Sequence, residues 1–167
     1  MEDMRVYVTN LGKYNEGELV GEWFDYPFSE EHISEVIGLD SNYEEYFITD
    51  YELPFHINEY ISINELNKKC EMVEEIMGTP LYNDMKEIIE MWFDDVEDLV
   101  DNQDDVIVYS DCSNMAEVAE SILEDTGELD SLSGRLAYYF DYEKFGRDLE
   151  IEGNFLIGKN CVYEYIN

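Results

Sequence analysis

The chain has 167 residues, and its 42 aspartates and glutamates against 9 lysines and arginines give a formal charge of -33 at pH 7. Small soluble domains usually carry a charge of magnitude about 2 to 8. A charge this negative excludes the basic patch by which proteins commonly hold nucleic acid, because each phosphate contact would be repulsive. It argues against anionic membranes as partners for the same reason.

The composition nevertheless predicts a folded chain. Isoleucine, leucine, valine and phenylalanine supply 46 of the 167 residues, above the roughly 20 % below which disorder is expected. The cysteines at 70, 112 and 161 are widely spaced, which supports neither a disulfide framework nor a zinc site. No run approaches the roughly 18 apolar residues of a membrane span, and the N-terminus lacks a signal-peptide pattern. We therefore expect a cytoplasmic protein with reduced thiols.

The beginning of the chain predicts a small antiparallel sheet with one helix. Val6 and Val8 alternate with polar residues, and the runs 19–26 and 43–51 are rich in β-branched and aromatic residues, as strands are. Between these runs, a serine N-cap and a glycine stop bound a helical pattern over 29–38.

The middle of the chain changes to helical spacing. Apolar residues recur every three or four positions over 63–77, and Gly78 ends this pattern. Thr79-Pro80 then predicts an N-cap with proline at the first helical position, and the apolar stripe continues over 81–93. An aspartate cap predicts a further short helix over 96–100. We expect a small helical bundle with acidic outer faces.

The last part of the chain contains both strand-like and helix-like spacing of apolar residues. A strand is predicted over 106–109, then a helix that stops at Gly127, then a helical stretch over 136–145. Three short strands follow, over 148–151, 154–157 and 161–165. The fold class is therefore predicted to be α+β, as an elongated chain of three small modules, 1–61, 62–104 and 105–167.

The negative charge is spread over all three predicted modules. They carry 15, 13 and 14 acidic residues against 2, 3 and 4 basic ones, in chain order. A disordered acidic tail would be a block of like charges without apolar periodicity, whereas these acids alternate with core-type residues throughout. We interpret the charge as a coat on folded elements.

No pattern in the sequence predicts catalysis or a metal site. The acidic stretch that begins at Asp101 fails as a calcium loop, because Val106 stands where the loop needs glycine and Cys112 where it needs its closing glutamate. His32 and His56 are isolated and form no metal-ligand motif. We expect no catalytic residues, no metal and no cofactor, and the protein is predicted not to be an enzyme.

The size of the charge matches a stretch of DNA. B-form DNA carries about one negative charge per 1.7 Å, so the net charge of this chain equals that of about 56 Å of duplex, some 16 base pairs. A compact chain of this length has a diameter of about 40 Å, so a field like that of DNA favours an elongated molecule. Such a protein would compete for the lysine and arginine rows of DNA-binding enzymes.

The run from Tyr14 to Asp25 reads YNEGELVGEWFD, and a shorter run, Asp50-Tyr51-Glu52, follows it. The later part of the chain contains Thr126-Gly127, Leu129-Asp130-Ser131 and the run from Tyr139 to Leu149, YFDYEKFGRDL. These residues resemble the ArdA family of antirestriction proteins: the first run is similar to the N-terminal signature of that family, the second to another of its elements, and the later residues to its C-terminal signature.

The resemblance implies a homodimeric mimic of B-form DNA, carried by conjugative plasmids or transposons. It implies that the protein occupies the DNA-binding groove of Type I restriction-modification enzymes, between the methyltransferase and specificity subunits, and so protects incoming unmodified DNA. The C-terminal module is expected to contribute to the dimer. From the charge alone, an acidic chaperone or decoy for other basic DNA-binding proteins stays open as the alternative.

We expect the signature residues to serve folding and dimerisation, and the acidic coat to bind the partner. The best candidates for that coat lie in the middle third of the chain: Glu71, Glu74, Glu75, Glu87, Glu90, Asp94, Asp95, Glu97, Asp98 and Asp101.

Overall fold

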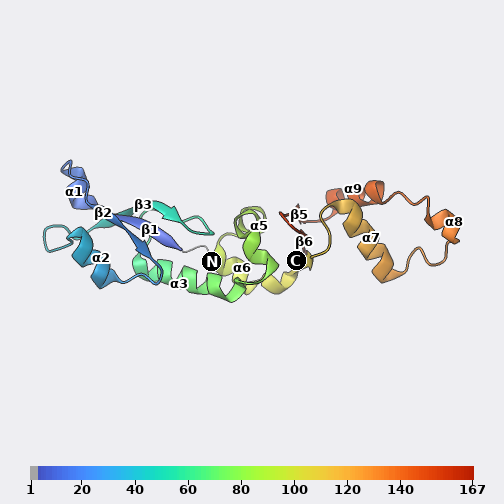
Figure 1. Ribbon diagram of the computed structural model, residues 1–167, viewed down its shortest axis with the longest axis horizontal. Helices are drawn as coiled ribbons and strands as arrows, with labels where there is room; N and C mark the ends of the chain where they lie inside the picture. The colour runs from blue at the N-terminus through green and yellow to red at the C-terminus, as the bar shows by residue number, and fades with distance from the viewer. Residues whose placement is uncertain (1–3) are drawn as a thin grey trace. The chain divides into compact units, whose positions relative to one another are not determined.

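The computed structural model describes residues 4–167, whose helices and strands are labelled in Figure 1. Its contacts divide the chain into two compact units. Unit 1 holds the described residues up to Met77 together with Met85–Val100, and unit 2 holds Gly78–Asp84 together with Asp101–Asn167. The contacts thus assign the central third of the chain to both units, and the division into three modules stays a prediction.

Unit 1 contains the predicted N-terminal sheet. Its strands are β1 (Arg5–Asn10), β2 (Gly21–Asp25) and β3 (Tyr46–Glu52), antiparallel in the order β2-β1-β3. Val6 and Val8 of the central strand are fully buried. A short helix that the sequence pattern did not predict, α1 (Leu11–Asn15), follows β1, because the side chain of Asn10 accepts a hydrogen bond from the Lys13 backbone N–H and caps it.

One face of this sheet is covered by the helix α2 (Glu30–Ile37), which packs against β1 and β2. The predicted caps are confirmed, since the Ser29 hydroxyl accepts from the His32 N–H and Gly38 ends the helix with a φ of 70°. Side chains alternate across a strand, so Arg5 and Tyr7 point away from the α2 side. We call the side of the sheet that bears Arg5 and Tyr7 the outer face.

The helices that complete unit 1 are α3 (Ile63–Ile76), α5 (Met85–Trp92) and α6 (Val96–Asp101), whose last residue, Asp101, is assigned to unit 2. The predicted apolar stripe of α3 is confirmed, because Leu66 and Val73 have no solvent exposure. The N-terminus of α3 is capped in the same way as that of α2, because the Ser62 hydroxyl accepts a hydrogen bond from the Glu65 N–H.

The helix predicted after Gly78 is interrupted at Asp84. It begins at Pro80 behind a Thr79 N-cap, as predicted, but α4 (Pro80–Asn83) ends after one turn. The carboxylate of Asp84 is buried in unit 2, 2.7 Å from the Tyr163 hydroxyl and 3.1 Å from the Lys159 backbone N–H. The apolar stripe of the sequence could not indicate this break, because it depends on hydrogen-bond partners about 75 residues further along the chain.

Unit 2 contains a second small sheet and a helix pair. Its strands β4 (Val106–Tyr109), β5 (Phe155–Ile157) and β6 (Val162–Tyr165) are antiparallel in the order β4-β6-β5. Its other elements are the 3-10 helix η1 (Gln103–Asp105) and the helices α7 (Met115–Thr126), α8 (Gly134–Ala137) and α9 (Tyr142–Glu152). Two antiparallel sheets with helices confirm the predicted α+β class.

The prediction of a strand over 148–151 is wrong, because these residues belong to α9. The carboxylate of Asp141 accepts from the Lys144 N–H and starts this helix. The apparent strand alternation is misleading, since Leu149 packs against the core of unit 2 whereas Ile151 is 76 % exposed. The helix predicted over 136–145 is also wrong in its bounds, and α8 and the start of α9 take its place.

The close packing of α9 on α7 depends on a glycine. A Cβ atom built on Gly146 would clash with the backbone oxygen of Met115 in α7. That neighbour is backbone and has little freedom to move aside. Any side chain at this position therefore has to push the two helices apart.

We expect Gly146→Ala to lower the free energy of unfolding by about 1 to 3 kcal/mol, the usual cost of overpacking. Gly134→Ala in α8 is the matched control, because a Cβ there would meet nothing within 4 Å. Urea unfolding followed by circular dichroism compares the two variants. Equal stabilities would contradict this account of the α7–α9 contact.

Candidate partner-binding surface

Nearly all carboxylates of the described chain are exposed. Asp84 is the buried exception, and Asp95, Asp98, Asp105 and Glu164 are half-buried. The ten acids predicted as the central coat are distributed over three helices and the turn before α6. Glu71, Glu74 and Glu75 lie on α3, Glu87 and Glu90 on α5, Asp94 and Asp95 before α6, and Glu97, Asp98 and Asp101 on α6.

Eight of these ten acids are exposed, and all except Asp101 belong to unit 1. Their exposure leaves them available to a partner, although nothing in the fold tests whether they bind one. Their role stays a prediction.

Asp95 has a structural function in addition to its charge. Its carboxylate accepts a hydrogen bond of 2.9 Å from Lys69 of α3, and its other oxygen accepts from the Asp98 N–H at the start of α6. The Lys69 hydrogen bond holds the pKa of Asp95 below its ordinary value. Asp95 therefore caps α6 and ties it to α3, and the predicted aspartate cap is confirmed.

Glu90 is paired with the histidine that the sequence indicated as isolated. His56 Nε2 lies 3.0 Å from the Glu90 carboxylate, and His56 Nδ1 lies 3.3 Å from the Tyr51 hydroxyl. A pocket of about 190 Å³ lies beside this pair, with Phe55 and Phe93 among its lining residues. The pairing joins β3 to α5 through the loop between β3 and α3.

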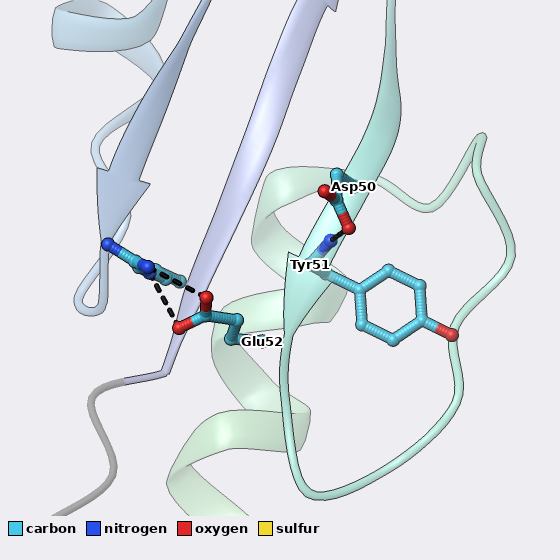
Figure 2. Close-up of polar contacts among 4 residues, drawn as sticks. Asp50, Tyr51 and Glu52 are labelled. Carbon is cyan, nitrogen blue, oxygen red and sulfur yellow. Dashed lines mark hydrogen bonds and ion pairs between the residues drawn. The ribbon is translucent and has the colours of Figure 1, made fainter.

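On the outer face of the sheet, Arg5 is held by residues of both neighbouring strands. Its Nε and Nη2 each donate a 2.7 Å hydrogen bond to Glu52 of β3, and its guanidinium lies 4.7 Å from the centre of the Trp23 ring on β2. Figure 2 marks the two hydrogen bonds at Glu52 and shows Tyr51 pointing to the other side of the strand. The hydrogen bonds from Arg5 lower the pKa of Glu52.

We call this arrangement of Arg5, Trp23 and Glu52 the arginine clasp. It brings together two of the sequence runs singled out above, because Trp23 lies in the run 14–25 and Glu52 in the run 50–52. Sequence reasoning missed the clasp, since only the register of β1 against both partners places these residues together. It links β1 to both of its neighbouring strands on the outer face.

The C-terminal runs also occupy structural positions. Gly127 ends α7 in the left-handed conformation, and Asp141 caps α9. The ring of Phe140 lies against those of Tyr142 and Phe145, with centres 5.1 and 5.8 Å apart. These contacts support the expectation that such residues serve folding.

The described residues contain no group of three or more histidine, cysteine, aspartate or glutamate side chains that could hold a metal ion. Burial raises the pKa of the Cys70 thiol to about 12 and also raises that of Cys112. Thiols of this kind are poor nucleophiles at neutral pH. Within residues 4–167, no helix is long and apolar enough to cross a membrane.

A family model described as antirestriction protein (ArdA) matches residues 6–164, nearly the whole chain. The chain belongs to the ArdA family of antirestriction proteins. No curated protein matches it. Members of the ArdA family are inhibitors directed at restriction enzymes, so antirestriction is the general function of this chain.

The Lys69 contact predicts a pH-dependent contribution of Asp95 to stability. Because the folded-state pKa is lowered, the stabilisation is present above the ordinary aspartate pKa of about 4 and is lost as the pH falls below it. We expect Asp95→Asn, which keeps a capping oxygen, to cost at most about 1 kcal/mol at pH 7.5, since the pair is partly screened by solvent. The cost should be smaller at pH 3 than at pH 7.5.

Asp94→Asn is the matched control for this experiment, because it removes the same charge from an exposed neighbour. Urea unfolding of both variants at pH 7.5 and pH 3 provides the comparison. Equal losses for the two variants at pH 7.5 would show that Lys69 is not the source of the effect.

Proposed function

We propose that this ArdA family member inhibits Type I restriction-modification enzymes by mimicking B-form DNA. It occupies the DNA-binding groove between the methyltransferase and specificity subunits and catalyses no reaction itself. It acts in the cytoplasm, on behalf of a conjugative plasmid or transposon whose unmodified DNA has just entered the cell. The observation that carries this proposal is the exposure of almost every carboxylate in a chain with a charge of -33.

Nine lysines and arginines cannot neutralise 42 carboxylates. Ion pairs in the described residues join Arg5 to Glu52 and Lys69 to Asp95, with the His56–Glu90 contact as a third when the histidine is protonated. Most of the coat therefore projects its field into solvent. A groove lined with lysine and arginine gains affinity for such a surface, and association is accelerated at low salt.

The central coat is proposed as the main contact because its acids lie on rigid elements. The helices α3, α5 and α6 have buried apolar sides, which fix the direction of their outer faces. Fixed charges lose less entropy on binding than charges on mobile segments. Glu71, Glu74 and Glu75 occupy one such helix and are all exposed.

Restriction in living cells tests the function directly. Expression of the protein in a host with a Type I system should raise the plating efficiency of unmodified phage by at least about tenfold. A host that lacks the system is the control and should show no change. Unaltered plating in the restricting host would refute the proposal.

Charge neutralisation tests the contribution of the central coat. We expect the triple variant Glu71→Gln, Glu74→Gln, Glu75→Gln to bind the purified methyltransferase about tenfold more weakly, at roughly 0.5 kcal/mol for each exposed charge. The control Glu124→Gln, Asp125→Asn, Glu128→Gln removes three charges near the end of α7 and should cost about twofold or less. Fluorescence anisotropy at several salt concentrations measures both affinities.

Binding should also weaken steeply with salt, and duplex DNA should displace the protein. Salt-insensitive binding would contradict mimicry. Equal losses for the two triple variants would contradict the assignment of the central coat. Equal affinity for nucleoid-associated proteins would favour the alternative of an acidic decoy for basic DNA-binding proteins.

The homodimer is proposed to form through the apolar residues around α8. Leu136, Tyr138 and Tyr139 are 59, 82 and 74 % exposed, and the two tyrosine rings lie 5.4 Å apart. Contiguous exposed apolar groups are typical of interaction sites. They give the C-terminal part of the chain exposed apolar side chains through which two highly acidic copies can meet.

We expect Leu136→Ser combined with Tyr139→Ser to convert a dimer into a monomer in light scattering after gel filtration. Leu19→Ser in unit 1 removes an equally exposed side chain and should leave the mass unchanged. A wild-type protein with the mass of one chain would overturn this part of the proposal.

A further inference from the structure

The outer face of the N-terminal sheet bears a second group of aromatic rings. The ring of Phe47 on β3 lies 5.3 Å from that of Tyr14, which belongs to α1, and 6.3 Å from that of Tyr60. Phe47 is almost buried between them, while Tyr14 and Tyr60 are 52 and 62 % exposed. We call these three residues the tyrosine stack.

The strand register places the tyrosine stack and the arginine clasp on the same face. Phe47 is the partner of Thr9 on β1, and Glu52 is the partner of Arg5. Thr9 and Arg5 alternate on the same side of β1, and directly paired residues share a side of the sheet. The outer face therefore has two aromatic sites, one at each end of β1.

The clasp shows how an arginine side chain binds on this face. It holds a guanidinium over the flat side of an aromatic ring while a carboxylate accepts two parallel hydrogen bonds from it. Aromatic faces attract cations electrostatically, and the planar guanidinium also stacks on them. The same face thus already binds one arginine, supplied by the chain itself.

The tyrosine stack has the same two kinds of group as the clasp, aromatic rings and a carboxylate, but no arginine of the described residues lies between them. Glu59 lies beside Tyr60, and its charge and hydrogen bond raise the pKa of that phenol. The neighbouring base in the sequence, Lys13, lies over the ring of Tyr43 instead, 5.6 Å from its centre. Exposed aromatic rings within an acidic surface are complementary to a cationic planar group.

We infer that the tyrosine stack binds an arginine side chain of a partner protein, with the guanidinium against the exposed faces of Tyr14 or Tyr60 and paired with Glu59. The inference rests on the proposed function, because the partner is a protein that presents arginines for DNA. It adds a contact that discriminates between basic residues. Carboxylates of the coat attract lysine and arginine alike by charge, whereas the rings favour the planar cation.

Two peptides of equal charge test this site, hexa-arginine and hexa-lysine, with binding to the full-length protein measured by calorimetry. A guanidinium on an exposed ring should give hexa-arginine about a two- to fivefold preference beyond that of the coat. Tyr14→Leu combined with Tyr60→Leu should remove this excess and leave hexa-lysine binding unchanged. Tyr14→Phe combined with Tyr60→Phe keeps the rings and should preserve it.

Val36→Ser is the matched control, because Val36 is also an exposed apolar residue but lies on α2, on the other side of the sheet. As a second measurement, N-acetyl-arginine amide should shift the ring resonances of Tyr14 and Tyr60 in the wild-type protein more than N-acetyl-lysine amide does. Equal shifts, or an arginine preference that survives the leucine variant, would overturn the inference. Inhibition of restriction without any arginine preference would overturn the inference and leave the proposed function standing.

Discussion

Repulsion among carboxylates is the constraint under which every element of this fold forms. With a formal charge of -33, the compact state is destabilised by its own field. The helices show how local structure persists under it. No basic residue occupies the last turn of the six longest, α2, α3, α5, α6, α7 and α9, so their dipoles are uncompensated at that end. Short polar side chains instead cap their N-termini, as Ser29, Ser62, Asn114 and Asp141 do.

Three of the nine lysines and arginines join elements that are distant in the sequence. Arg5 joins β1 to β3 through Glu52, and Lys69 joins α3 to the start of α6 through Asp95. Lys159 in unit 2 donates from its side chain to the carbonyl of Asn83 and from its backbone to Asp84. Each of these bases therefore acts as a tertiary contact, and the coat outside these contacts keeps its negative charge.

Local signals allowed much of the fold to be predicted, because they are carried by adjacent residues. The helix between Ser29 and Gly38 is an example, since its cap, its apolar face and its glycine stop all lie within ten residues. The segment 148–151 shows the limit, because Leu149 and Ile151 have the spacing of a strand while their helix is started by Asp141. The helix break at Asp84 and the arginine clasp could not be predicted from the sequence, because both depend on hydrogen-bond partners more than 45 residues away. For the central coat, exposure was predictable from the helical period, whereas the pairing of Glu90 with His56 was not.

The clasp explains why the recognisable runs of the sequence are not the acidic surface itself. A coat of many exposed charges loses little when one is removed, since each contributes a few tenths of a kcal/mol, so its individual positions carry little information. Trp23 and Glu52, by contrast, contact one arginine of the strand between them, so each has a specific partner in the sheet. The positions of the acidic residues can then differ while the strands and helices that carry them keep their arrangement. Such a surface combines two features. Its diffuse negative field attracts any basic groove, and a few aromatic side chains have a geometry that suits the planar guanidinium of arginine.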